Sequence, residues 1–319
     1  MNRIAITAVL LLGTAVAAED QIFTDPSKAG PDFQVQGEYQ GMLGSDGEEV
    51  KFGLQVIALG DHRFDAVGYM GGLPGDGWNR EKKIKATGGT ENGVTTLTSE
   101  NGSATISNGK ATIYSEDGEE VGTLKKVERK SPTLGAKPPE GAMVLFDGTS
   151  ADHFKGGMIT MGDLLAANCE TKEKLGDHTL HLEFRTPFKP AARGQARGNS
   201  GVYLQGRYEC QVLDSFGLEG ENNECGGIYS IAKPYVNACF PPLSWQTYDI
   251  DFTAARWEDG KKVKNARTTI RHNGIVIHDD LELPHGTPGK YPEVEGPESL
   301  YLQGHGNPVV YRNIWVVRK

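Results

Sequence analysis

The sequence lacks runs of Lys and Arg, and it has no excess of positive charge. Its 319 residues include 33 Lys and Arg against 42 Asp and Glu, which gives a net charge of −9. An acidic chain without basic runs binds nucleic acids and anionic membranes poorly. We therefore expect neither nucleic acid nor a membrane surface as a partner.

Beyond its first 18 residues the sequence also lacks any apolar run long enough to cross a membrane. Residues 4–16 are apolar, follow the positive Asn2-Arg3 pair and end in the small-x-small pattern Ala15-Val16-Ala17. This order is typical of a secretory signal peptide, which we place at residues 1–18. The mature protein is predicted to be exported, to the periplasm or the cell exterior, without membrane insertion after cleavage.

Sustained helical periodicity is absent as well. The chain instead alternates short β-prone runs with glycine-rich turns, and 42 of its residues are glycine. This pattern predicts an all-β protein. Residues 19–130 are expected to form a small antiparallel β domain of unknown role, with strands at 37–42, 49–59, 62–70, 82–87, 93–99, 103–107, 110–114 and 122–129.

Two segments interrupt this pattern. The loop 71–78, GGLPGDGW, presents Trp78, which we expect to plug one end of the small domain; contact with a sugar or partner is the alternative. The segment 131–140, SPTLGAKPPE, has three prolines and is predicted to be a semi-rigid linker. The second domain therefore spans residues 141–319.

Cysteine is scarce, and neither a CxxC pair nor a His-rich metal spacing is present. In an exported protein the four cysteines can pair. Cys225 and Cys239 bracket a short loop, and we predict a disulfide between them. Cys210 lies on the expected core face of a strand and is predicted to be a buried thiol, whereas the state of Cys169 is open.

In the second domain several runs alternate apolar and polar residues with a period of two, as expected for strands with one buried face. The residues expected in the core are Leu180, Leu182, Phe184, Tyr248, Ile250, Phe252, Ile270, Leu300 and Leu302.

Residues 198–215, GNSGVYLQGRYECQVLDS, read as a β-hairpin. A two-residue loop would place Leu204 opposite Glu209. A three-residue loop at 205–207 places Leu204 opposite Tyr208 and Tyr203 opposite Glu209, and gathers the apolar residues on one face. Because a one-residue slip would invert every side chain, the pattern selects the three-residue loop.

The other face of this hairpin is polar. Rings and planar polar groups on one sheet face suit a sugar, while a solvated outer face is the simpler interpretation. Strand alternation also points polar residues away from the core on other strands, among them Glu183, Arg185 and Gln303, with His305 just past a glycine. Asn199 stands just before the hairpin.

The hairpin segment, followed by ECGGIY, NACFPP and WQTYDIDF, resembles the DUF1080 family, also called 3-keto-disaccharide hydrolase domains. The resemblance covers about residues 141–319 and includes an opening motif, FDGTSADHFKGG, in which Phe154 stands where the family often has Trp. It implies a concanavalin A-like jelly-roll sandwich whose concave sheet binds carbohydrate, and cleavage of 3-keto-glycosides. If the strands assemble as the family implies, one face collects Glu183, Arg185, Tyr203, Glu209, Gln211, Gln303 and His305.

That chemistry needs a base for the proton at C2, a donor for the enolate oxygen and an acid for the leaving group. Glu209 or His305 is the expected base, and Arg185, Asn199 or Gln211 would stabilise the enolate. Glu183, Tyr203, Asp214 and Gln303 are expected to contact substrate, although Asp214 can equally cap a turn and Arg185 can simply balance a glutamate. A divalent metal would be an alternative enolate stabiliser, but the sequence shows no ligand spacing for one.

Two other functions fit part of the pattern. A non-catalytic carbohydrate-binding protein would use the same polar face without a titratable group at the sugar. A retaining glycosidase would need two carboxylates about 5 Å apart, and the E-x-D-x-x-E spacing of laminarinase-like enzymes is absent.

Overall fold

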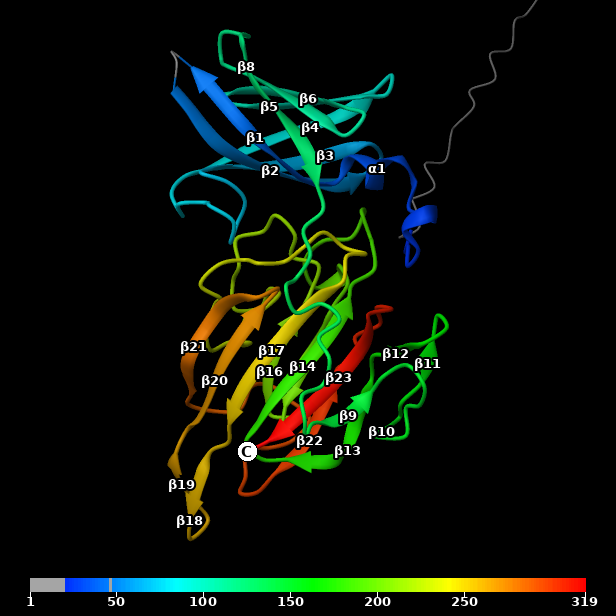
Figure 1. Ribbon diagram of the computed structural model, residues 1–319, viewed down its shortest axis with the longest axis vertical. Helices are drawn as coiled ribbons and strands as arrows, with labels where there is room; N and C mark the ends of the chain where they lie inside the picture. Colours follow the sequence, from blue (N-terminus) through cyan, green and yellow to red (C-terminus); the bar gives the residue numbers. More distant parts are fainter. Residues whose placement is uncertain (1–20, 46–47) are drawn as a thin grey trace, which may run out of the picture.

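The computed structural model describes residues 21–45 and 48–319 and arranges them in two β-rich parts, stacked one above the other in Figure 1. The predicted signal peptide at 1–18 lies outside these residues. In the part of the chain that is described, no helix is long and apolar enough to span a membrane.

The first part is a closed antiparallel barrel of eight strands, preceded by a 3₁₀ turn η1 (Pro26–Lys28) and a short helix α1 (Gly30–Val35). Each predicted strand has a counterpart in it. The strands are β1 (Gly37–Ser45), β2 (Glu48–Gly60), β3 (Arg63–Met70), β4 (Lys83–Glu91), β5 (Val94–Ser99), β6 (Gly102–Ser107), β7 (Lys110–Tyr114) and β8 (Glu120–Val127).

The second part is a sandwich of two antiparallel sheets. The smaller sheet has the order β10 (Phe154–Lys155), β13 (Cys169–Leu175), β22 (Glu298–Leu302), β15 (Ser200–Leu204) and β16 (Tyr208–Val212). The larger sheet has the order β11 (Ile159–Thr160), β12 (Leu164–Ala166), β23 (Val310–Arg318), β14 (His178–Arg185), β17 (Gln246–Thr253), β20 (Ala266–His272) and β21 (Ile275–Leu283), with β9 (Met143–Phe146) also on β23. A hairpin, β18 (Arg256–Glu258) with β19 (Lys261–Lys264), and a 3₁₀ turn η2 (Gly194–Ala196) complete it.

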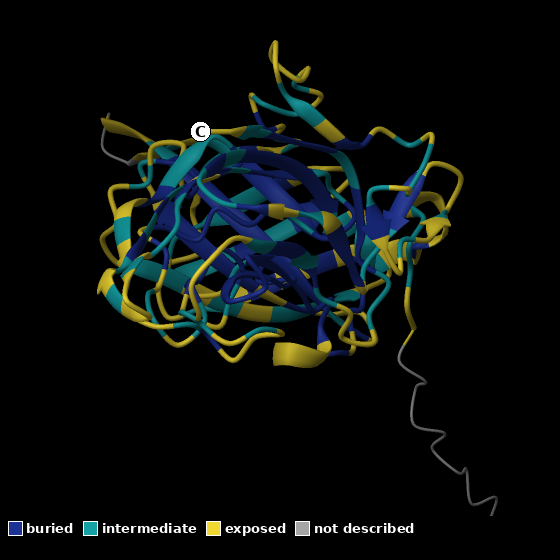
Figure 2. Ribbon diagram, turned by 90° about the horizontal axis from the view of Figure 1, so that it is seen from below, coloured by how far each residue is buried: buried dark blue, intermediate teal, exposed yellow. Residues whose placement is uncertain are grey.

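The core of the sandwich lies between the two sheets, where Figure 2 shows the buried strands as dark ribbons. All nine residues expected in this core are buried there, as the period-two pattern predicts. Burial of each large apolar side chain stabilises the fold by roughly 1.5–3 kcal/mol. The all-β class, with a concanavalin A-like jelly-roll sandwich preceded by a small antiparallel β domain, is therefore confirmed.

Barrel and sandwich meet through a separate apolar cluster on the outside of the barrel. Ile57, Val67 and Tyr69 pack there against Phe216 of the sandwich. The ring of Trp78 packs edge-on against Tyr69, with 5.2 Å between ring centroids. The prediction that Trp78 plugs the barrel is wrong, because its loop folds outward and the ring fills this junction instead.

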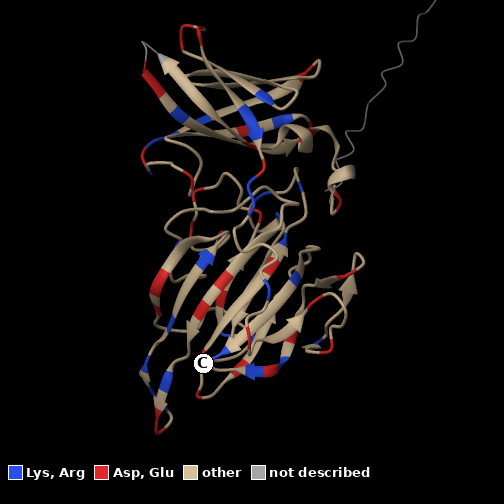
Figure 3. Ribbon diagram, viewed as in Figure 1, with Lys and Arg blue, Asp and Glu red and all other residues tan. Residues whose placement is uncertain are grey.

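Charged residues of both signs are interspersed over both parts (Figure 3). Some of them join the two parts. Lys83 and Lys85 of β4 reach Glu219 of the sandwich at 2.6 and 3.1 Å.

Residues 131–136, the first half of the predicted linker, lie on the outer face of the larger sheet. The Thr133 hydroxyl donates to Asp249 at 2.6 Å, and the Gly135 N–H donates to Glu183 at 2.5 Å. The Ala136 carbonyl accepts bonds from Asn313 and Trp315. This segment is therefore docked along the sheet rather than free as a spacer.

Candidate active site

The hairpin of β15 and β16 has the register that the sequence predicts. Leu204 pairs with Tyr208 and Tyr203 pairs with Glu209, across a loop at 205–207. Gln205 and Gly206 have φ of 53° and 61°, the left-handed conformation that a three-residue hairpin loop needs. The outer face of this sheet consequently carries Tyr203 and Glu209 side by side.

Gly201 makes room for the Glu209 carboxylate on this face. A Cβ atom at Gly201 would lie 2.5 Å from Glu209 Oε1 and 2.8 Å from the ring of Tyr203. Neither distance is compatible with a side chain, so the carboxylate lies over the strand in a space that only glycine leaves open. β22 continues the same face, because Tyr301 pairs with Tyr203 and the Gln303 N–H donates to the Gly201 carbonyl. We call Asn199, Tyr203, Glu209, Gln211 and Gln303 the Glu209 site.

Two loops cover the Glu209 site. From the loop 284–297, Thr287 Oγ1 accepts the Glu209 N–H at 3.0 Å and the Pro288 carbonyl accepts the Tyr203 hydroxyl at 3.4 Å. From a second loop, along the same edge of β16, the Tyr229 N–H donates to the Glu209 carbonyl at 3.2 Å. Glu209 is left only 4% exposed, and the face expected to be open is largely enclosed.

Burial changes the acidity of Glu209. It raises the pKa of this carboxyl to about 7, while its contact with the Tyr203 hydroxyl acts in the opposite direction. No ion pair of the described residues includes Glu209, and no neighbouring carboxylate contributes to the shift. A buried carboxyl that titrates near neutral pH is a feature of catalytic acids and bases.

Beside this carboxyl, buried amide oxygens are left without partners. Gln303 Nε2 donates to the Tyr203 hydroxyl at 3.0 Å, but Gln303 Oε1 accepts nothing. Asn199 Nδ2 donates to Gln195 Oε1 at 2.8 Å, while Asn199 Oδ1 is likewise buried and unpaired. Gln211 Nε2 also donates to Gln195, at 3.2 Å. A buried acceptor without a hydrogen bond costs free energy, so these two oxygens are suited to accept hydrogen bonds from the hydroxyl groups of a ligand.

Sequence reasoning missed an aromatic group at the border of the site. The rings of Tyr203 and Tyr301 lie 5.6 Å apart, and Lys290 Nζ lies 4.7 Å from the Tyr301 ring. Lys290 and the Tyr291 hydroxyl both bind Glu170, at 2.8 and 2.6 Å. The alternation of β22 places Tyr301 opposite its core residues, but no local pattern brings 290–291 to this face.

Arg185 and Glu183 do not belong to the Glu209 site, which corrects the expectation of a single shared face. Both lie on β14 in the larger sheet, whereas Tyr203 and Glu209 lie in the smaller one. The outer faces of the two sheets point in opposite directions, with the core between them. The Arg185 guanidinium instead stacks on Trp245 at 5.0 Å and donates to the Thr24 carbonyl.

Glu183 is buried under the docked segment 131–136 and holds it in place. Arg312 and Asn313 donate to its carboxylate at 2.6 and 2.9 Å. Although burial acts to raise the pKa of Glu183, its contact with His181 at 3.7 Å and the hydrogen bonds from Asn313, Gly135 and Arg312 lower it to about 2. Burial acts to lower the pKa of His181, but its contacts with Asp249 and Glu183 outweigh burial and raise this pKa. Because Glu183 is fully buried and its carboxylate is held by these donors and by the Gly135 N–H, we assign it a structural role.

We expect Glu183→Gln to loosen the segment 131–136 and to lower the free energy of unfolding by roughly 1–3 kcal/mol, because buried partners lose an acceptor. Because the pKa of Glu183 is lowered, its contribution to the stability of the folded state is complete above about pH 4.5 and is lost as the pH falls towards 2. Because the pKa of His181 is raised, its contribution is complete below about pH 6.5 and is lost as the pH rises through the raised pKa. Amide exchange of 131–136, normalised for intrinsic rates, should therefore be slowest between these values. Unchanged protection in the variant would refute this role; Glu282→Gln, in an exposed pair with Arg267, is the control.

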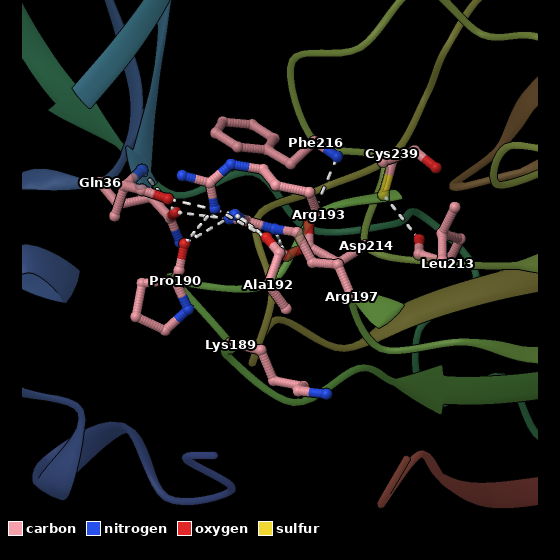
Figure 4. A network of polar contacts seen from close by, with 12 residues as sticks. Gln36, Lys189, Pro190, Ala192, Arg193, Arg197, Leu213, Asp214, Phe216 and Cys239 are labelled. Carbon is pink, nitrogen blue, oxygen red and sulfur yellow. Dashed lines mark hydrogen bonds and ion pairs between the residues drawn. The ribbon is translucent and has the colours of Figure 1, made fainter. Parts of the chain in front are cut away.

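Asp214 is also structural. Its carboxylate accepts from Arg197 Nε at 2.7 Å, and both side chains are buried. Arg197 donates in addition to the carbonyl of Ala58 in the barrel at 3.1 Å and reaches Gln36 at 3.5 Å (Figure 4). Asp214 thus orients an arginine that joins barrel and sandwich, and it does not point into the Glu209 site.

His305 is exposed at the end of β22, between Gly304 and Gly306. Its backbone carbonyl accepts from Asn307 Nδ2 at 3.0 Å. Only Gly304 separates it from Gln303 in the chain, so it lies at the edge of the Glu209 site and stays the alternative base.

The predicted disulfide is wrong, because all four cysteines are free, buried thiols. The Cys225 sulfur lies 3.3 Å from the Tyr248 hydroxyl, and the Cys239 sulfur donates to the Phe240 carbonyl at 3.4 Å. Cys210 is a buried thiol, as its core position indicates. Cys169 is the fourth, and burial raises its pKa to about 12.

Residues 21–45 and 48–319 contain no group of three or more His, Cys, Asp and Glu side chains able to hold a metal ion. The residues at the Glu209 site therefore do not fit a metal held by the protein alone, and we derive no step through one.

Comparison with known proteins places this geometry in context. Residues 141–317 match the family described as 3-keto-alpha-glucoside-1,2-lyase-like domains. Two crystal structures similar to the chain are each described as a "putative glycosyl hydrolase" from Parabacteroides distasonis ATCC 8503. One is 31% identical, with a TM-score of 0.52, and the match covers 57% of this chain and 85% of that one. The other is 17% identical over 56% and 94% of the two chains, with a TM-score of 0.42. No curated protein sequence matched.

Proposed function

Since the chain belongs to the family of 3-keto-alpha-glucoside-1,2-lyase-like domains through residues 141–317, we propose that it is a carbohydrate-active enzyme that cleaves 3-keto-glycosides. The reaction is proton abstraction at C2, elimination at C1 and addition of water. Export through the predicted signal peptide is part of the same proposal.

The observation that carries this proposal is the state of Glu209. Its carboxyl is buried, has no ion-pair partner among the described residues and titrates near pH 7. A general base works best when its pKa lies near the working pH. A protein that only binds sugar has no need of such a group, so Glu209 favours the enzyme over the binding protein.

The proposed reaction uses Glu209 and Tyr203 together. The ketone at C3 acidifies the C2 proton, which Glu209 accepts, and the electron pair moves to the C3 oxygen as an enolate. Burial raises the pKa of the Tyr203 phenol, so it stays protonated and can donate to that oxygen. When the enolate collapses, the bond from C1 to the leaving oxygen breaks, and the leaving oxygen takes up a proton. Water then adds its hydroxyl at C1 and a proton returns to C2, which gives net hydrolysis.

Asn199 and Gln303 are proposed to position the sugar. Their unpaired, buried carbonyl oxygens would accept hydrogen bonds from hydroxyl groups of the ring. The ring of Tyr301 beside Tyr203 offers an apolar surface for the sugar's C–H groups. The ordinary retaining mechanism is not favoured, because no second carboxylate influences the pKa of Glu209.

Incubation of the purified protein with a 3-keto-disaccharide, and in parallel with its unoxidised parent, tests this function. We expect monosaccharide release from the keto-sugar alone, because the parent lacks the acidic C2 proton. Release from both would indicate ordinary glycoside hydrolysis. Binding of the keto-sugar without any turnover would support the carbohydrate-binding protein instead.

A further inference from the structure

The eight-stranded barrel is filled with side chains at one end only. At the end next to α1, inward-facing residues such as Tyr39, Val56 and Phe64 pack into a core. Phe33 and Val35 of α1 pack against this core, and the Tyr39 hydroxyl donates to the Val35 carbonyl at 2.6 Å. The helix therefore closes this end of the barrel.

At the other end the barrel holds a cavity of about 450 Å³. Small inward-facing residues leave this space: Ala104 pairs with Leu97 on one side and Ile113 on the other, and Gly68 and Ala86 lie on neighbouring strands. An eight-stranded barrel either fills its interior with side chains or holds one small ligand. The volume is roughly three times that of a cavity of about 150 Å³ that binds benzene, and it falls within the usual range for ligand sites.

The cavity wall is apolar, formed chiefly by Leu43, Phe52, Leu54, Ile84, Leu97 and Ile113. Val50 and Met70 also line it and are 40% and 36% exposed, so apolar side chains reach its mouth. Such a wall offers a sugar almost no hydrogen bonds, which separates this cavity from the Glu209 site.

The polar residues that line the cavity carry no positive charge. They are Glu48, Ser99, Asn101, Ser103, Tyr114 and Ser115, and no Lys, Arg or His is among the described residues that line the cavity. A carboxylate or sulfate group of a ligand would meet the Glu48 carboxylate and lose its hydration without a cationic partner. A hydroxyl, ester or amide group would find hydroxyl and amide partners there.

We propose that the barrel is a binding site for one uncharged, hydrophobic small molecule, with its apolar body in the cavity and a hydrogen-bonding group at the mouth. The site does not depend on the proposed sugar chemistry. Its occupant is selected by the apolar wall, by the volume and by the lack of a cationic side chain among the described lining residues.

Two fluorescent dyes with the same aromatic skeleton test the charge selection on the full-length mature protein. N-phenyl-1-naphthylamine is uncharged at pH 8, and 8-anilino-1-naphthalenesulfonate carries a sulfonate. We expect the neutral dye to bind with a stoichiometry of one, and the sulfonate at least ~10-fold more weakly, because its charge would be buried unpaired.

Three variants place the dye. Ala104→Trp should fill the cavity and abolish binding of the neutral dye. Val50→Lys puts a cation at the mouth and should strengthen sulfonate binding at least ~10-fold, since it supplies the missing partner. Met42→Lys is the matched control, because Met42 is 45% exposed on the same hairpin but does not line the cavity.

Thermal unfolding of each variant shows whether it is folded. If Ala104→Trp fails to fold, the comparison of Val50→Lys with Met42→Lys decides by itself. Equal effects of these two lysines, or equal binding of the two dyes to the unmodified protein, would overturn the proposal. Turnover of the keto-sugar should be unchanged in Val50→Lys, so a failure of this site is distinguishable from a failure of the proposed enzyme.

Discussion

Glu209→Gln is expected to lower kcat/KM for a 3-keto-glycoside at least ~100-fold, the lower end of what a general base contributes. The amide keeps the shape of the side chain and its place over Gly201, but it cannot accept the C2 proton. Steady-state kinetics of the purified variant on the keto-sugar measure this loss. Glu173→Gln, in strand β13 of the same sheet and paired with His153, is the control and should keep normal turnover.

The pH dependence gives a second view of the same residue. Because the carboxylate is the active form and burial raises its pKa to about 7, kcat/KM of the unmodified protein should rise with pH and level off above about 7. The raised pKa favours the folded state most below about pH 4.5, and this stabilisation is lost as pH rises to 7. At pH 8 the Gln variant should therefore be no less stable than the unmodified protein. The raised pKa of Glu209 sets an upper limit of about 3 kcal/mol on the increase in the free energy of unfolding.

Three results would change this assignment. Near-normal turnover in Glu209→Gln would show that Glu209 is not the base, and His305→Asn would then be the next variant to measure. A kcat/KM that does not vary between pH 5 and 8 would contradict the titration of Glu209. A loss of stability at every pH with normal turnover per folded molecule would assign Glu209 a structural role.

Asp214→Asn is expected to lower the free energy of unfolding by about 3–5 kcal/mol, the cost of leaving one charge of a buried pair uncompensated. Arg197 would keep its bonds to the carbonyls of Ala58, Pro190 and Ala192, but these cannot neutralise it. Because Arg197 lies between barrel and sandwich, both parts should be affected. Denaturant unfolding at pH 7, followed by tryptophan fluorescence, measures the change.

Asp280→Asn is the matched control, since the Asp280–Arg267 pair is exposed and should contribute at most about 1 kcal/mol. In Asp214→Asn, the molecules that remain folded at low temperature should turn over keto-sugar normally. An altered KM with little change in stability would instead show that Asp214 contacts substrate, as the sequence first suggested.

The sequence by itself determined the strands and which face of each is buried. The eight barrel strands follow from runs and glycine turns that are local in the chain. The register of Tyr203 against Glu209 follows from the apolar pattern, because a slip by one residue would expose Leu204 and Tyr208. The resemblance of 141–319 to its family rests on motifs that are likewise continuous in sequence.

Only the tertiary structure decided what lies on each outer face. An alternation with a period of two separates core-facing from outward-facing side chains. A sandwich, however, has two outer faces, one on each sheet, and the alternation does not assign Arg185 and Glu209 to different sheets. The loop 284–297 covers Glu209 from about 80 residues away, and this burial, not the local sequence, raises its pKa. The barrel cavity likewise depends on how small residues from separate strands come together. Its volume is set by side chains of several strands, so no single segment of the sequence predicts it.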